Sequence, residues 1–114
     1  GLTFLNPTLA FAGLAAVCPP RTDPANEHIF HQYTVRAERR DQLVEHLKAQ
    51  GIGCAVYYPT PLHLQPCFEF LGYRRGSLPV TEAAMTSVLS LPIYPELTEA
   101  QQAQVVNAIR GFYA

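Results

Sequence analysis

Aromatic and hydrogen-bonding side chains are concentrated in the stretch Tyr57–Pro66, YYPTPLHLQP. Its three prolines remove backbone donors, fix φ and push the residues before them towards extended conformations. We therefore expect a stiff, near-extended loop that holds its side chains in place at low entropic cost. The tyrosines, His63 and Gln65 can bind polar groups, and a tyrosine face can pack against a flat ring. The loop is either a substrate-facing wall or a rigid connection whose tyrosines cover the core.

Residue types and spacing raise two other possibilities, a metal site and a cysteine nucleophile. His28 and His31 stand three residues apart on an expected strand and point to opposite faces, so they cannot chelate a metal together. We predict no metal site. Cys54 with His63 as its base would make a nucleophile, but Cys54 is expected to be buried in a strand. Nothing in the sequence lowers the pKa of that thiol.

Two arginine pairs are candidate anion-binding groups. Arg39–Arg40 opens an exposed helix, so we expect it to be solvated surface. Arg74–Arg75 lies on a glycine-bounded loop and is the better candidate for binding phosphate.

Length and composition indicate one ordinary domain. The chain has 114 residues and a formal net charge of −1, which allows a core without disulfides and gives no general attraction to nucleic acid or membrane. The three cysteines form no CxxC pair, so we expect no disulfide framework and a cytoplasmic location. The apolar opening, Gly1–Val17, has no basic start and is too short to span a bilayer, and we expect no export signal.

Lysine usage limits covalent chemistry. Lys48 is the only lysine, and it lies in the last turn of an expected helix, off the apolar stripe. A mechanism that needs a buried lysine must therefore find it outside this chain.

Hydrophobic periodicity and caps predict the elements that position these groups. We expect strands at His28–Arg36, Cys54–Tyr58 and roughly Val88–Ile93, with helices at Glu38–Gln50, at Thr81–Val88 and from the capping box Thr98/Gln101 to about Tyr113.

Leu43, Val44 and Leu47 form the stripe of the first helix, and Val105, Ile109 and Phe112 form that of the last. Gly51 supplies the C′ position of the first helix, and Thr81 is the expected N-cap of the second. A short helical turn is expected at Pro66–Leu71, with Cys67, Phe68, Phe70 and Leu71 partly buried.

This order predicts an α+β fold: a small antiparallel or mixed three-stranded sheet with helices packed mainly on one face.

The motifs HIFHQYTVR, RRDQLVEHLKAQGI, YYPTPLHLQP, LPVTEAA and LSLPIYPELTEAQQAQVV, in this order, resemble the C-terminal part of the DegT/DnrJ-type sugar aminotransferases. These are pyridoxal-phosphate (PLP) enzymes of fold type I that act on nucleotide-linked keto sugars. The resemblance runs from about Glu27 to Phe112. It implies a lead and connector at residues 1–25 and the small C-terminal domain at residues 26–114. The opening, Gly1–Ala12, does not resemble the interdomain helix of the family.

In the family that this chain resembles, the large N-terminal domain supplies the Schiff-base lysine, the acid on the pyridine nitrogen and the phosphate site. Lys48 falls in a surface helix of that pattern. The resemblance therefore implies PLP in the intact parent, no cofactor bound to this chain, no catalytic residue on it and no activity by itself.

For this chain the resemblance implies a wall of the substrate site. The candidate substrate-binding residues are His63, Tyr58, Tyr33, Gln65 and His31. The implied partners are a nucleotide sugar and an amino donor, reached through the missing large domain, and a second subunit in a homodimer. The alternative is a stand-alone small α+β ligand-binding or interaction module without catalysis, and the reading frame upstream of Gly1 would separate the two.

Overall fold

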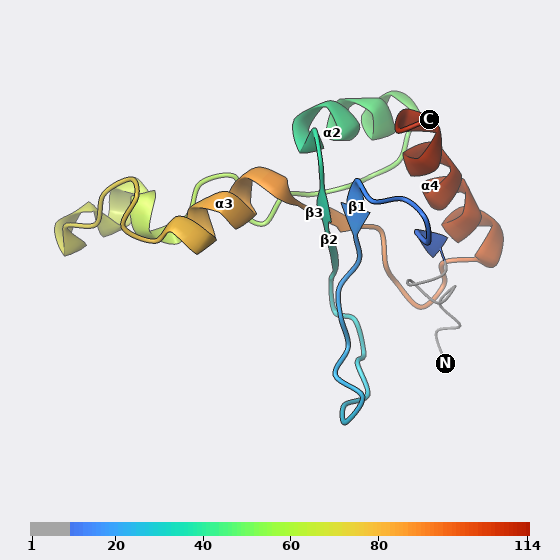
Figure 1. Ribbon diagram of the computed structural model, residues 1–114, viewed down its shortest axis with the longest axis horizontal. Helices are drawn as coiled ribbons and strands as arrows, with labels where there is room; N and C mark the ends of the chain where they lie inside the picture. Colours follow the sequence, from blue (N-terminus) through green and yellow to red (C-terminus); the bar gives the residue numbers. More distant parts are fainter. Residues whose placement is uncertain (1–9) are drawn as a thin grey trace.

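The structure is a computed structural model that describes residues 10–114, so the expectation for residues 1–9 lies outside the described residues. A three-stranded antiparallel sheet in the order β1-β2-β3 forms its centre, with α2 and α4 packed beside it (Figure 1). This confirms the α+β class and the three-stranded sheet. The elements are β1 (Val17–Cys18), β2 (Tyr33–Ala37), α2 (Arg40–Ala49), the 3-10 helices η1 (Leu62–Leu64) and η2 (Pro66–Leu71), α3 (Pro79–Ser87), β3 (Val88–Leu91) and α4 (Glu99–Phe112).

The core lies between the sheet and the two long helices. Leu43 and Leu47 of α2, Leu89 of β3 and Ile109 of α4 are fully buried, and Val35 of β2 is almost so. The apolar stripes of the two helices, read from their period, therefore face the sheet as predicted. Val44, Val105 and Phe112 pack at the edge of this cluster.

One predicted strand is wrong. Between Cys54 and Tyr58 only Ala55 pairs, through a single bridge to Ser90. The prolines at 59 and 61 cannot donate ladder hydrogen bonds, so the chain leaves the edge of β3 after that bridge. The third strand is instead β1, where Val17 pairs with Ala37. Sequence periodicity could not find β1 because two residues show no period.

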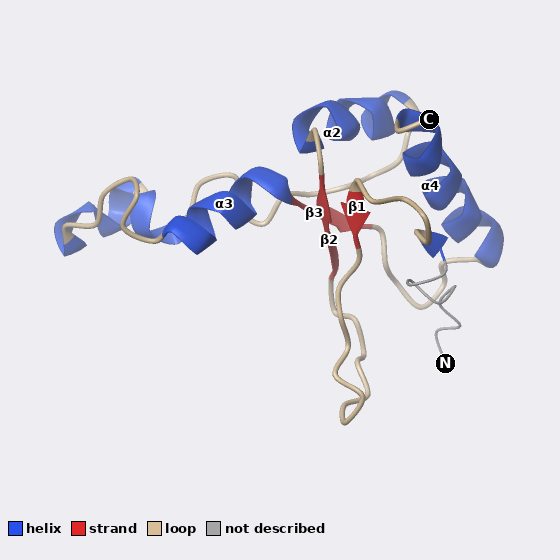
Figure 2. Cartoon of the chain, viewed as in Figure 1, coloured by secondary structure: helices blue, strands red, loops and turns tan. Residues whose placement is uncertain are grey.

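The strand expected at His28–Arg36 begins later, at Tyr33, and ends at Ala37. Phe30 has a φ of 51°, in the left-handed region, and donates its N–H to Nδ1 of His28. This local turn interrupts extended backbone before β2 begins. Residues 19–32 consequently form a long loop that projects from the sheet (Figure 2).

Two of the three helix-terminal residues or motifs predicted from the sequence are found in the structure. Gly51, with a φ of 73°, follows the C-cap of α2 as predicted. The capping box at Thr98 and Gln101 is present at the start of α4. At α3, however, the N-cap is Leu78 and not Thr81, because Pro79 occupies the first turn, where its fixed φ suits a helix start.

Residues 57–87, here called the arm, project away from the sheet and the two long helices (Figure 1). They comprise η1, η2, the loop at 72–78 and α3. The radius of gyration is 15.7 Å, whereas a compact domain of this length has about 13 Å. The predicted turn at Pro66–Leu71 is present, but Cys67, Phe68, Phe70 and Leu71 are exposed and not partly buried, because the described chain packs little against this turn.

At the other side of the molecule, the described chain begins next to α4. The Arg110 guanidinium donates to the carbonyls of Ala10 (3.0 Å) and Ala12 (2.8 Å). The described part of the chain has no helix long and apolar enough to cross a membrane.

Thr98→Ala is expected to lower the free energy of unfolding by about 1 kcal/mol, because the Gln101 N–H loses its hydroxyl acceptor. Thr81→Ala is the matched control, since Thr81 is exposed inside α3 and caps nothing. Urea unfolding of both variants measures the difference. Equal losses would show that the cap is not what stabilises α4.

Candidate functional site

A groove in the arm is the first of two cavities that concern function. It has a volume of about 440 Å³ and is open to solvent. Its walls come from the proline loop, from the two 3-10 helices and from α3, and they are almost entirely apolar: Tyr58, Pro61, Leu62, His63, Phe68, Leu71, Leu78, Thr81 and Met85. Such a lining suits an apolar or aromatic group and offers few polar partners.

His63 is a buried member of this lining. Its ring belongs to η1, and Nε2 lies 3.3 Å from Oε2 of Glu82 on α3. The ring also meets Tyr73 edge-on, with centroids 6.0 Å apart. Its Nδ1 is buried without a hydrogen-bond partner in the described structure. The imidazole therefore joins two elements of the arm.

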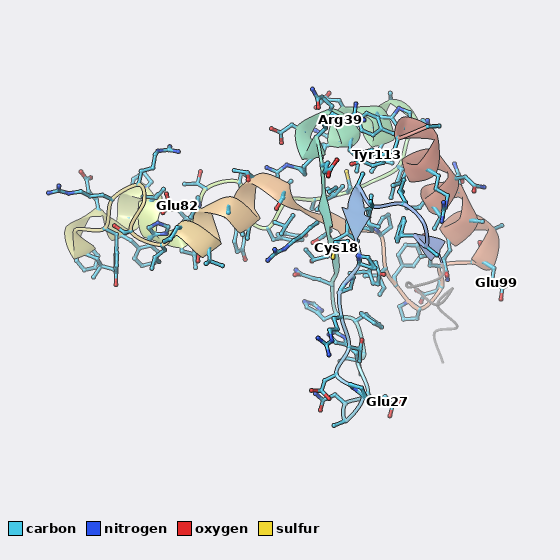
Figure 3. The ribbon with its side chains drawn as sticks, viewed as in Figure 1. Cys18, Glu27, Arg39, Glu82, Glu99 and Tyr113 are labelled. Carbon is cyan, nitrogen blue, oxygen red and sulfur yellow. The ribbon has the colours of Figure 1, made fainter. Side chains whose placement is uncertain are left out.

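Glu82 is the residue that holds the arm together (Figure 3). Besides His63, its carboxylate accepts hydrogen bonds from the backbone N–H of Gly76 at 2.7 Å and of Leu78 at 3.1 Å. One side chain thus connects η1, the loop at 72–78 and the first turn of α3. The Gly76 N–H is the main reason why the pKa of Glu82 is lowered; burial opposes this shift, and smaller contributions from Leu78 and His63 support it.

This lowered pKa predicts a pH dependence of the arm. A carboxyl whose pKa is lower in the folded state stabilises that state above its unfolded pKa, and the contribution is lost as pH falls through the folded value. We expect the hydrogen-exchange protection of the Gly76 and Leu78 amides, corrected for intrinsic rate, to fall as pH drops below the ordinary value of 4.5.

Glu82→Gln keeps an acceptor oxygen but no charge, so it should lower this protection at neutral pH and flatten its pH dependence. Glu69→Gln, on exposed η2, is the control and should change neither. An unchanged pH profile in the Glu82 variant would contradict the assignment of these contacts to the carboxylate.

A second, more polar cleft of about 310 Å³ lies between the start of β2, the segment after Gly53 and the end of β3. Its polar groups come from His31, Gln32, Tyr57 and Ser90, and its remaining walls are Gly53, Cys54, Ala55, Leu91, Pro92 and Ile93. His31 and Tyr57 are exposed at this cleft. Imidazole and phenol groups in such a setting can bind hydroxyls.

The two neighbouring tyrosines thus serve different cavities. Tyr57 lines the polar cleft and Tyr58 lines the groove, with their rings edge-on at 5.7 Å. The backbone N–H of Tyr58 donates to Sδ of Met85, which ties the proline loop to α3. The sequence analysis ranked Tyr58 and omitted Tyr57, although adjacent residues of an extended segment point to opposite sides and either could have been chosen.

The five predicted substrate-binding residues do not meet at one point. Tyr58 and His63 share the groove, and His31 lines the cleft. Tyr33 is buried in β2 next to Phe30, and burial raises its pKa to about 12. Gln65 donates to the Thr60 carbonyl at 3.2 Å and so braces the proline loop.

The other candidate groups are the Cys54 thiol, the Arg74–Arg75 pair and side chains that could bind a metal. Cys54 is half-buried, and burial raises the pKa of its thiol, which disfavours the thiolate that nucleophilic attack needs. Arg74 and Arg75 are exposed on the loop at 72–78. Among residues 10–114 no group of three His, Cys, Asp or Glu side chains has the geometry to hold a metal ion.

PLP does not fit the residues of this chain. A Schiff base requires an amine that can lose its proton, as in a desolvated pocket. Lys48, the only lysine, is 61% exposed on α2 and lies 3.7 Å from Glu45. The chain therefore offers no lysine to which the cofactor could be attached.

Comparison with known proteins identifies the family. Residues 5–110 match the DegT/DnrJ/EryC1/StrS aminotransferase family. The chain belongs to this family. This confirms the resemblance seen in the motifs of the proline loop and of the segment before α4.

Individual members are similar over most of the chain. A pleiotropic regulatory protein of Geobacillus stearothermophilus is 54% identical over 97 residues, which are 85% of this chain and 26% of that protein. The dTDP-3-amino-3,4,6-trideoxy-alpha-D-glucose transaminase of Streptomyces venezuelae is 43% identical over 99 residues, 87% of this chain and 26% of the enzyme. The chain thus spans about a quarter of the length of these relatives.

Solved structures show the same arrangement. DesV of S. venezuelae, in complex with a ketimine intermediate, superimposes with a TM-score of 0.87 at 41% identity, over 92% of this chain and 28% of that one. An aminotransferase of the family from Brucella abortus gives a TM-score of 0.84 at 36% identity, over 94% of this chain and 28% of its own. The fold described above is therefore that of about a quarter of each of these two chains.

Proposed function

We propose that this chain is the C-terminal small domain, residues 26–114 with a lead at 1–25 that contributes β1 to its sheet, of a PLP-dependent aminotransferase that acts on a nucleotide-linked keto sugar. Membership of the aminotransferase family supports the reaction, and the S. venezuelae relative, named as a transaminase of a dTDP-linked sugar, supports the substrate class. The parent is proposed to be a cytoplasmic homodimer.

The exposed position of Lys48 is the observation that supports separate roles for this chain, which binds the sugar substrate, and for the rest of the parent, which supplies the Schiff-base lysine. When bound to the parent, PLP would supply the chemistry that moves an amino group from the donor to the carbonyl of the acceptor. The lysine that this needs must come from the portion of the parent outside this chain. What this domain contributes is binding and orientation of the sugar substrate.

The exposed side chains are proposed to contact the substrate directly. Tyr57 and His31 can bind sugar hydroxyls at the polar cleft, and Tyr58 offers a ring face at the groove. His63, Tyr33 and Gln65 remain part of the proposed site, and they act by supporting its walls. His63 does so through Glu82, and Gln65 through Thr60.

The test is made on the isolated chain. We expect no transaminase activity and no stoichiometric PLP adduct after borohydride reduction, read by intact mass and peptide mapping. Lys48→Ala is the control, and it should leave both results unchanged. Turnover together with one adduct at Lys48 that the variant abolishes would contradict the proposal.

A further inference from the structure

The polar cleft between the start of β2 and the end of β3 is lined by uncharged groups. Among the described residues that line it, none is an Asp, Glu, Lys or Arg. Lys48 and Glu45 act from outside the cleft on the pKa of the Cys54 thiol in opposite directions, and they lie 3.7 Å from each other. Their effects on a charge in the cleft therefore oppose each other. The polar side chains of the lining are His31, Gln32, Tyr57 and Ser90.

Three of these four polar side chains are open to a ligand. His31, Gln32 and Tyr57 are exposed. The Ser90 hydroxyl instead lies 2.9 Å from that of Thr34, in a hydrogen bond between β3 and β2. An imidazole, a primary amide and a phenol can each donate and accept a hydrogen bond. A sugar hydroxyl also does both, whereas a carboxylate only accepts, so the exposed groups are matched to hydroxyls.

The remaining lining and the size of the cleft suit one sugar ring. The volume of about 310 Å³ is at the lower end of the range for small-molecule sites, about 300–1,000 Å³. The C–H face of a sugar can pack on the apolar wall, while the anionic diphosphate of a nucleotide sugar would find no cation here and must lie outside. The wall consists of Gly53, Cys54, Ala55, Leu91, Pro92 and Ile93.

Sequence similarity leaves open whether the sugar carries a carboxylate. The S. venezuelae relative, at 43% identity, is named as a transaminase of a dTDP-linked trideoxyglucose. A relative from Pseudomonas aeruginosa is 40% identical over 71% of this chain and 22% of that enzyme. It is named as an aminotransferase of UDP-2-acetamido-2-deoxy-3-oxo-D-glucuronate, whose sugar is a uronate. Because the two are about equally similar to this chain, the lining of the cleft is the observation that distinguishes the two kinds of sugar.

We propose that the polar cleft binds an uncharged sugar and disfavours a uronate, with His31, Gln32 and Tyr57 as the residues that determine this specificity. The inference rests on the proposed function, which makes the ligand a nucleotide sugar. A carboxylate that enters the cleft gives up water and gains no cation, which costs more free energy than the transfer of a hydroxyl. A hydroxyl exchanges its bonds to water for bonds to the three side chains.

Two nucleotide sugars that differ at one carbon test this specificity. UDP-glucose has a hydroxymethyl group where UDP-glucuronate has a carboxylate, and the corresponding dTDP-linked pair differs in the same way. Dissociation constants for the full-length gene product are measured by calorimetry in 0.15 M salt at pH 8, where an imidazole is ordinarily uncharged. We expect the glucose ligand to bind at least about tenfold more tightly than its glucuronate counterpart. Equal constants, tighter binding of the glucuronate, or no binding of any of the four ligands would overturn the proposal.

Two matched variants assign the preference to the cleft. Gln32→Arg adds a cation at the lining, so it should improve the binding of the glucuronate relative to the glucose ligand by about tenfold or more. Thr22→Arg is the control, because it adds the same charge at an exposed position of the same loop that does not line the cleft. Its ratio of the two constants should stay within about twofold of the wild type. If the two variants changed the ratio equally, or if Gln32→Arg left it unchanged, the preference would arise outside the cleft and the proposal would be wrong.

The outcome is separable from that of the proposed function. A full-length protein that transaminates a nucleotide-linked keto sugar but binds glucose and glucuronate ligands equally would support the aminotransferase assignment and contradict the specificity. One that prefers the glucose ligands, with Gln32→Arg removing the preference, but transaminates no keto sugar would do the reverse.

Discussion

Replacing Arg40 by alanine is expected to lower the free energy of unfolding by about 3 kcal/mol. The side chain is 8% exposed, and its two terminal nitrogens donate to the carbonyls of Val88 at 2.7 Å and Met85 at 2.8 Å. Nε donates to Asp41 at 2.6 Å. Without the guanidinium, both part-buried carbonyls at the junction of α3 and β3 lose their donor. The loss also detaches the base of the arm from α2.

Arg39→Ala is the matched control for this prediction, because it removes the same charge one residue away. Arg39 is exposed, and its guanidinium lies 4.7 Å from the centre of the Phe112 ring. A cation above an aromatic ring at an exposed site contributes about 0.5–1 kcal/mol, so the expected loss is of that order. Urea unfolding of both variants measures the two losses. Equal values would show that burial of Arg40 carries no stabilisation of its own.

These two arginines also show a limit of prediction from sequence. The sequence analysis expected both to be solvated, and this is wrong for Arg40. Arg39 is the N-cap, with left-handed backbone at a φ of 50°, whereas Arg40 is the first helical residue, so the two side chains point in different directions and one of them can face the interior. Which one does depends on where the end of α3 lies in space, and a local pattern holds no such information.

Features that depend on residues close together in the sequence were predicted well. The stripes of α2 and α4, Gly51 after α2 and the capping box at Thr98 each depend on residues within a few positions of one another. The strand pairing depends on residues far apart in the sequence. There the prediction was wrong, because it placed the third strand around Ala55, whereas the third strand is β1. The expectation that the apolar residues of η2 are partly buried is wrong for a further reason. Apolar character predicts that a residue is covered, but it does not say by which part of the protein.

The sequence motifs predicted the family of the chain, but they predicted the arrangement of the candidate site residues only in part. The motifs around Tyr58 and His31 identified the aminotransferase family, and the match over residues 5–110 confirms it. Their three-dimensional arrangement could not be derived from sequence, because His63 is buried against a carboxylate nineteen residues later. Contacts of this kind, between groups far apart in the chain, form only once the helices have packed. The roles of the five candidate residues in binding substrate stay predictions.

The largest functional effect is expected from His31 in the full-length protein. If the imidazole binds a sugar hydroxyl at the polar cleft, His31→Ala removes a hydrogen bond worth about 1–3 kcal/mol, which lowers kcat/KM for the nucleotide sugar by a factor of about 5 to 150. The half-reaction with the amino donor should stay near normal, because the donor does not carry that hydroxyl. The Tm should also hold, since His31 is exposed.

His28→Ala supplies the control from the same loop. His28 is also exposed and does not line the cleft; it stacks on Phe30 with ring centroids 4.2 Å apart and accepts the Phe30 N–H through Nδ1. It should leave kcat/KM for the sugar substrate within about twofold of the wild type, since a surface change away from the site alters energies by about 0.5 kcal/mol or less. Single-turnover kinetics of the two half-reactions separate the cases. If His31→Ala slowed both half-reactions alike, or if His28→Ala matched it, the imidazole of His31 would have a structural role in the loop, and the sugar would have to be bound elsewhere.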